Sequence, residues 1–271
     1  MEEQLENEIV VVRPRRKGIY LLPNLLTTGC LFSGFYAIVA AIDGNFERAG
    51  EAVFVAMIFD GLDGRVARLT STETAFGKEY DSLADLAAFG IAPAIVSYQW
   101  GVARIAEYGK LWYRFGWLAA FFYAAACALR LAKFNSRVQD KRYFEGLPCP
   151  SAAAIVAAFL WGSSEWEWRE PGLPGLILAF AITAAAGALM VSRFSYSSFK
   201  GFDLTRPVRF LSMVVVVAGF IFIAQDPPLV LLAVFGGYAA WSPIVWLWRR
   251  VRRARRGDDR AAPAPPREPT L

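Results

Sequence analysis

Four aspartates stand at spacings that align their carboxylates on helix faces. Asp60 and Asp63 are three residues apart, and Asp81 and Asp85 are four residues apart. Residues three or four apart lie on the same face of a helix, so each pair presents two carboxylates in one direction. Four carboxylates gathered at one point would repel each other and lose hydration, so cations must neutralise them. Two nearby arginines could contribute, but divalent cations suit this set better.

The residue types that the chain lacks narrow the chemistry further. It contains no histidine, which excludes His-based catalytic triads, His–zinc sites and imidazole acid–base catalysis. Its cysteines, Cys30, Cys127 and Cys149, lie in or beside apolar runs, and we expect them to be small buried hydrophobes. Oxygen ligands without His or Cys favour Mg²⁺, Mn²⁺ or Ca²⁺ over zinc. Two such ions held by carboxylates suit a phosphoryl-type displacement.

The elements that must position these acids are membrane helices. The 271 residues are 56% hydrophobic with a mean hydropathy of +0.35, too apolar for a soluble domain. A helix needs roughly 20 mostly apolar residues to span a bilayer. We therefore predict an all-α polytopic membrane protein with about eight transmembrane helices, near residues 21–42, 49–69, 82–100, 111–131, 151–164, 173–191, 208–224 and 228–248. A short connection makes the second and third antiparallel neighbours, so the four acids can converge near one membrane interface.

Basic residues divide unevenly between the two sides that this topology defines. One side carries 24 of the 29 Lys and Arg residues, and the positive-inside rule makes that side, with both termini and the acids, cytoplasmic. We expect a multi-pass protein of the cell (inner) membrane. Its parts are a cytoplasmic arm over residues 1–17, a membrane-embedded domain over 18–249, and a basic, Pro/Ala-rich, disordered tail over 250–271. The sequence gives no sign of nucleic-acid binding, so the pI of 9.2 reflects membrane topology.

The acidic stretch as a whole resembles the signature of a known enzyme family. It reads D-x-x-D-G-x-x-A-R-x8-G-x-x-x-D-x-x-x-D, the pattern of the CDP-alcohol phosphatidyltransferases. The matching positions are Asp60, Asp63, Gly64, Ala67, Arg68, Gly77, Asp81 and Asp85. The stretch from Leu22 to Thr27 also resembles the N-terminal element of that family.

Three further stretches resemble the phosphatidylserine synthase branch of the family. They run from Arg130 to Asn135, from Gly146 to Ala153 and from Met190 to Lys200, so the similarity covers roughly residues 20–200. Two positions depart from the branch pattern. Cys30 stands where asparagine is usual and loses a polar contact, and Lys133 stands where arginine is common and loses the bidentate fork.

This resemblance implies a reaction and a set of roles. The substrates would be CDP-diacylglycerol and L-serine, and the products phosphatidylserine and CMP, formed by direct displacement in a membrane-lipid environment. The fold would be a six-helix core, with two extra C-terminal helices here, and the assembly a homodimer. Two divalent cations, Mg²⁺ or Mn²⁺, would be held by Asp60, Asp63, Asp81 and Asp85. Asp85 would also be the base that takes the proton of the serine hydroxyl.

Further residues are expected to contact the substrates. The CDP-diacylglycerol contacts would be Asn24, Thr27, Gly64, Ala67, Arg68, Thr74 and Gly77. A cytoplasmic basic and polar set would recognise the serine carboxylate or the lipid phosphate, namely Arg130, Lys133, Asn135, Arg193 and Lys200. Ordinary positive-inside topology explains each member of this second set equally well.

Two other functions remain open at the level of sequence. One is the same family chemistry with another acceptor, such as glycerol phosphate or inositol phosphate, which the shared signature does not separate from serine. The other is a cation transporter that uses intramembrane aspartates. A transporter would more naturally carry its ionisable residues at mid-membrane on discontinuous helices, whereas these acids cluster at one interface beside Gly64 and Ala67.

Overall fold

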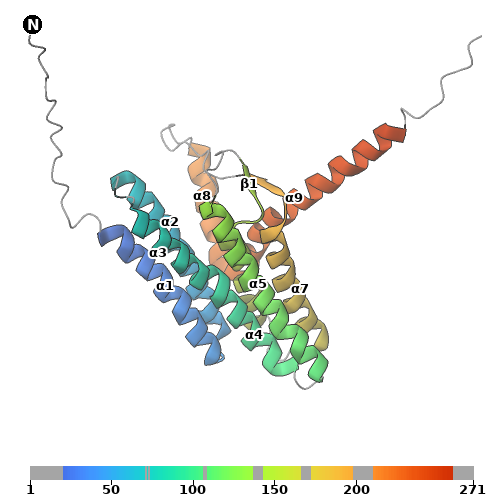
Figure 1. Cartoon of the computed structure of the whole chain (residues 1–271), viewed down its shortest axis with the longest axis horizontal. Helices are drawn as coiled ribbons and strands as arrows, with labels where there is room; N and C mark the ends of the chain where they lie inside the picture. Colours follow the sequence, from blue (N-terminus) through green and yellow to red (C-terminus); the bar gives the residue numbers. More distant parts are fainter. Residues whose placement is uncertain are drawn as a thin grey trace, which may run out of the picture.

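In its described part, the protein is a bundle of helices with one small pair of strands (Figure 1). The computed structural model describes residues 21–70, 72, 74–105, 109–136, 143–165, 172–197 and 210–258. Its elements are α1 (Leu21–Ile42), α2 (Phe46–Thr70), α3 (Ala75–Asp85), the π-helical segment η2 (Leu86–Ile91), α4 (Ala92–Ile105), α5 (Lys110–Ser136), β1 (Tyr143–Glu145), α6 (Cys149–Glu165), α7 (Leu173–Val191), β2 (Ser195–Ser197), α8 (Phe210–Gln225) and α9 (Pro227–Asp258).

The predicted all-α membrane fold is confirmed, and the described residues of each predicted apolar segment are helical, those of 82–100 across α3, η2 and α4. In the described part of the chain, four helices are long and apolar enough to cross a membrane, namely α1, Arg114–Ser136 of α5, α7, and Pro227–Arg252 of α9. Other helices are too charged or too short to meet this criterion. α2 and α3 carry the charges of the acidic stretch, and α6 and α8 are only 17 and 16 residues long. Eight spans therefore stay a prediction.

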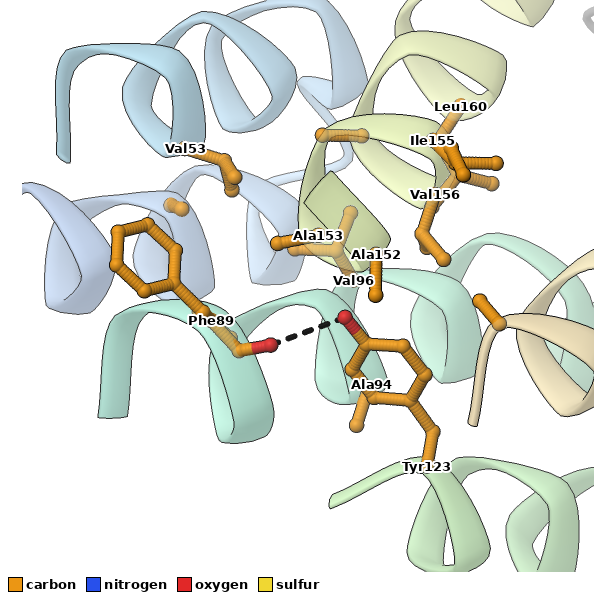
Figure 2. Close-up of a cluster of buried hydrophobic side chains, with 14 of the residues drawn as sticks. Val53, Phe89, Ala94, Val96, Tyr123, Ala152, Ala153, Ile155, Val156 and Leu160 are labelled. Carbon is orange, nitrogen blue, oxygen red and sulfur yellow. Dashed lines mark hydrogen bonds between the residues drawn. The ribbon is translucent and has the colours of Figure 1, made fainter. Parts of the chain in front are cut away.

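Small residues let the helices approach closely. α6 is buried along almost its whole length and packs against α2, α4, α7 and α9. Figure 2 shows part of the buried cluster, in which Val53, Val96 and Ile155 lie with several alanines between the helices. At Gly34 of α1, a Cβ atom would lie 2.6 Å from the Cα of Ala88 in η2. Glycine and alanine at these contacts allow close van der Waals packing of the helices in place of a large apolar core.

A widened turn interrupts the long helix that carries Asp81 and Asp85. α3, η2 and α4 follow one another without a break from Ala75 to Ile105. Pro93 lies near the start of α4, and a proline has no N–H for the carbonyl four residues earlier and clashes with it. That carbonyl belongs to Phe89, and the buried Tyr123 of α5 donates its hydroxyl to it at 3.0 Å (Figure 2). The π-helical distortion of this long helix therefore begins directly after Asp85.

The C-terminal helix departs from the prediction in length. α9 continues to Asp258 (Figure 1), so the first residues of the tail expected to be disordered, 250–258, are helical. Arginine is a good helix former, and the guanidinium groups of Arg250 and Arg252 lie over the rings of Trp246 and Trp248. The predicted arm over 1–17 and residues 259–271 lie outside the described residues.

Candidate active site

Three of the four predicted acids come together between α2 and α3. Asp60, Asp63 and Asp81 each offer a carboxylate oxygen, and these atoms all lie within 4.8 Å of one another. The spacing of three residues in α2 aligns the first two, as expected. α3 brings Asp81 to them because both helices pack against α1.

α1 supplies a hydrogen bond that orients the most buried of these carboxylates. Asp63 is only 4% exposed, and its Oδ2 accepts a hydrogen bond from the Thr27 hydroxyl at 2.8 Å. The same hydroxyl lies 3.1 Å from the backbone oxygen of Pro23, one turn earlier in α1. A side chain fixed in this way holds the carboxylate in one orientation, as partners of metal-binding carboxylates commonly do.

Asp85 lies one helical turn beyond Asp81, at the end of α3. It is within electrostatic range of Asp60 and Asp81. Its Oδ1 atom is buried and has no hydrogen-bond partner among the described residues. A buried carboxylate oxygen without a partner is costly, so this atom is available to a substrate or an ion. The π-helical segment that starts at Leu86 sets its position, and such segments are frequent at functional sites.

A cavity of about 470 Å³ opens beside the acids. Its wall includes Asp63 and Asp81 and all seven residues expected to contact CDP-diacylglycerol, Asn24, Thr27, Gly64, Ala67, Arg68, Thr74 and Gly77. Thr74 has a second role, since its hydroxyl accepts from the Gly77 backbone N–H at 2.9 Å and caps α3. Space is tight here, because a Cβ atom on Gly77 would lie 3.0 Å from that hydroxyl oxygen.

The basic and polar set is spread more widely. Lys133 forms an ion pair with Glu145 of β1, with 2.6 Å between Nζ and Oε2, and the Asn135 amide donates to the Ser82 hydroxyl at 2.9 Å. Arg193 is exposed between α7 and β2, and Lys200 lies outside the described residues. Two of these residues therefore have structural partners that the sequence did not indicate.

Arg130 is the member of this set that faces inward. Its Nη1 atom lies 3.8 Å from the sulfur of Cys149, and its Nε atom is buried without a hydrogen-bond partner in the described part of the chain. Cys149 is also within electrostatic range of Asp85. The Nε atom of Arg130 and the Oδ1 atom of Asp85 are thus a buried donor and a buried acceptor that both lack hydrogen-bond partners among the described residues.

Sequence reasoning missed several residues at the cavity. Lys78, Thr72 and Phe134 also line it. The spacing of three residues between Lys78 and Asp81 was a usable signal, because it places both on one face of α3. Cys30 is buried within electrostatic range of all four acids. A polar side chain at position 30 would therefore lie close to the acidic cluster.

The arrangement can hold a hard cation. Three carboxylates converge, two of them, Asp63 and Asp81, in the wall of an open cavity, and no lysine or arginine forms an ion pair with them among the described residues. Carboxylate oxygens are the ligands that Mg²⁺ and Mn²⁺ prefer. An ion bound here would lie where a phosphate group in the cavity could reach it.

Comparison with known proteins gives relatives over most of the chain. The profile of the family described as CDP-alcohol phosphatidyltransferase matches residues 20–241. A CDP-diacylglycerol–serine O-phosphatidyltransferase of Helicobacter pylori (strain ATCC 700392 / 26695) is 35% identical over 86% of this chain and 94% of its own. The protein of that name from Mycobacterium leprae is 33% identical over 57% of this chain and 55% of its own. An archaetidylserine synthase of Methanothermobacter thermautotrophicus is 33% identical over 66% and 71%, respectively.

Proposed function

This chain belongs to the CDP-alcohol phosphatidyltransferase family, and we propose that it transfers the phosphatidyl group of CDP-diacylglycerol to L-serine. The products are phosphatidylserine and CMP. The observation that carries the proposal is the cluster of Asp60, Asp63 and Asp81, within 4.8 Å of one another beside a cavity of about 470 Å³. Serine is favoured as the acceptor because relatives at 33–36% identity bear the serine transferase name.

Asp60, Asp63 and Asp81 are the proposed ligands of two divalent cations, Mg²⁺ or Mn²⁺, with Asp85 as a further ligand. The close approach of the three oxygens and the all-oxygen chemistry support this assignment. When bound, such ions polarise a phosphoryl group and stabilise the departing phosphate. Thr27 keeps Asp63 turned toward the cluster through its hydrogen bond.

Asp85 is the proposed general base. Its unpartnered Oδ1 atom takes the proton of the serine hydroxyl as the serine oxygen forms a bond to the phosphorus that bears the diacylglycerol. The bond from that phosphorus to the oxygen of CMP breaks in the same displacement. A positioned base contributes about 10²–10⁴-fold to such a step. The chain has no histidine, which favours direct transfer over a covalent intermediate.

The cavity residues bind the CDP group. Gly64, Ala67 and Gly77 leave room for the nucleotide, and Arg68 and Lys78 supply positive charge for its phosphates. Asn24 belongs to the same wall. Arg130, with its buried and unpartnered Nε atom, is the proposed partner of the serine carboxylate.

The protein's place in the cell follows from the charge distribution. We propose that it lies in the cell membrane with both termini and the active site on the cytoplasmic face, where 24 of its 29 basic residues would lie. The acyl chains of the substrate would stay in the bilayer while its head group enters the cavity. A homodimer, as the family resemblance implies, completes this proposal.

A panel of acceptors tests the function. Purified protein, CDP-diacylglycerol and Mg²⁺ are incubated with L-serine, glycerol phosphate or inositol phosphate, and CMP release and the lipid product are measured. We expect CMP release and phosphatidylserine formation when L-serine is the acceptor, and no CMP release with either of the other two acceptors. CMP release with another acceptor and not with serine would overturn the substrate assignment. Cation flux in liposomes without any CMP formation would instead favour a transporter.

A further inference from the structure

The helix α9 contains a backbone acceptor that its own helix does not satisfy. Pro243 lies inside α9, and a proline provides no N–H for the carbonyl four residues earlier. That carbonyl belongs to Ala239, which is only 4% exposed. A buried carbonyl left without a donor costs free energy, so the fold must bring a donor from elsewhere.

Tyr196 of β2 is that donor. Its hydroxyl lies 3.0 Å from the backbone oxygen of Ala239, and its side chain is 2% exposed. Burial raises the pKa of Tyr196 to about 12, so the hydroxyl keeps its proton at neutral pH. Next to it, the Ser242 hydroxyl donates to the Ser195 backbone oxygen at 2.9 Å. Two hydrogen bonds therefore fasten β2 to the α9 segment around Pro243.

β1 and β2 form an antiparallel pair, here called the strap, which leads from α9 to the active site. Glu145 of β1 is paired with Ser195 of β2, and its carboxylate holds Lys133 of α5. The next residue, Gly146, has a φ of +83° and donates its N–H to the Phe194 oxygen at 2.9 Å. The chain then enters α6 at Cys149.

The end of the strap determines what surrounds Arg130. Cys149 is the first residue of α6, two residues after Leu147, whose N–H donates to the Leu189 oxygen at 3.0 Å. The Nη1 atom of Arg130 lies 3.8 Å from the sulfur of Cys149. Arg130 and Lys133 are three residues apart on α5, so both face the strap. Displacement of the strap would move the partners of both basic residues.

The same chemistry occurs a second time in this fold. Pro93 frees the carbonyl of Phe89, and the Tyr123 hydroxyl donates to it at 3.0 Å (Figure 2). There the bond ties α5 to the segment after Asp85. In both places a tyrosine hydroxyl donates to a backbone carbonyl that a proline leaves without its helical N–H. In both places the bond lies beside an element that carries proposed site residues.

We propose that Tyr196 is a positioning residue for the serine-binding side of the active site, held in place by the carbonyl that Pro243 frees. This inference rests on the proposed function, because it takes Arg130 as the partner of the serine carboxylate. It gives α9, one of the two C-terminal helices outside the expected six-helix core, a part in substrate recognition. α9 acts through the strap and touches no substrate.

Steady-state kinetics of the full-length protein in lipid nanodiscs test the proposal. Tyr196→Phe removes only the hydroxyl, and we expect the KM for serine to rise about fivefold, the factor of one net hydrogen bond. The KM for CDP-diacylglycerol and kcat should stay within about twofold of the wild type. Pro243→Ala restores an N–H that competes for the Ala239 carbonyl, so it should raise the KM for serine similarly. The double variant should be no worse than either single variant, because both changes break one interaction.

A matched control separates positioning from general loosening. Thr183→Val removes a buried hydrogen bond of 2.8 Å between α7 and Ser97 of α4, away from the strap, and should leave the KM for serine unchanged. The proposal is overturned if Tyr196→Phe leaves that KM unchanged, if the two single effects multiply, or if the control raises it equally. If the Tyr196→Phe protein does not fold, the KM for serine of the Pro243→Ala variant tests the proposal by itself. Wild-type CMP release with serine tests the proposed function separately from these ratios.

Discussion

Replacement of Thr27 by valine should weaken the binding of the activating metal. The change removes the hydroxyl that donates to Asp63 Oδ2 at 2.8 Å and keeps the shape of the side chain. A hydrogen bond to a charged group contributes roughly 1.5–3 kcal/mol, and loss of a partner of a metal ligand typically costs about 10–100-fold in metal affinity. We expect the free Mg²⁺ concentration for half-maximal activity to rise by at least about tenfold.

The assay is CMP release at saturating CDP-diacylglycerol and serine over a series of free Mg²⁺ concentrations. Thr27→Ser keeps the hydroxyl and should stay near the wild-type curve. Ser33→Ala, which removes only a bond to the backbone oxygen of Gly29 on the same helix, should leave the curve unchanged. If Thr27→Val activates at the wild-type Mg²⁺ concentration, the hydroxyl does not orient a metal ligand and the reasoning fails.

Three other perturbations test the general base, the metal dependence and the strap separately. Asp85→Asn should lower kcat by at least about 10²-fold while CDP-diacylglycerol still binds in an equilibrium assay, and near-normal turnover would exclude Asp85 as the base. Chelation by EDTA should stop CMP release, and Mg²⁺ or Mn²⁺ should restore it; activity that persists without metal would rule out metal assistance. Gly146→Ala should greatly reduce the yield of folded protein in size-exclusion chromatography, because the φ of +83° is strained for alanine and its Cβ atom would clash with the Met190 oxygen; a normal yield would show that the strap tolerates displacement.

The helices and the convergence of the acids could be predicted from local rules. α1 and α7 begin and end where the apolar runs Leu21–Ile42 and Leu173–Val191 do, because membrane helices are selected by continuous hydrophobicity. The spacing of Asp60 and Asp63 and the short connection to α3 were enough to bring three acids together. These features depend on residues that are near one another in the chain.

The missed features depend on residues far apart in the chain. Thr27 and Asp63 are 36 positions apart, and Tyr196 and Ala239 are 43 apart, so no periodicity links them. Pro93 and Pro243 were visible in the sequence, but the tyrosine that satisfies each freed carbonyl was not. The strands of the strap are three residues long, too short to show an alternating pattern.

The charged end of α9 was misread for a different reason. A run of arginines resembles a solvated tail in composition, yet arginine favours the helix and the helix was already formed by the apolar residues before it. Asn135 illustrates a similar limit, because its amide bonds Ser82 of α3, a contact that composition cannot indicate. Charge and residue type therefore did not predict the partner of each side chain.

Direct binding of Mn²⁺ tests whether Asp60, Asp63 and Asp81 form a divalent-cation site. Electron paramagnetic resonance of the purified full-length protein would measure bound Mn²⁺ against its free concentration, with Mg²⁺ as competitor. We expect saturable Mn²⁺ binding that Mg²⁺ displaces and that Asp63→Asn weakens by at least about tenfold. Wild-type protein that forms phosphatidylserine while binding no Mn²⁺, or Asp63→Asn protein that binds it normally, would contradict this assignment.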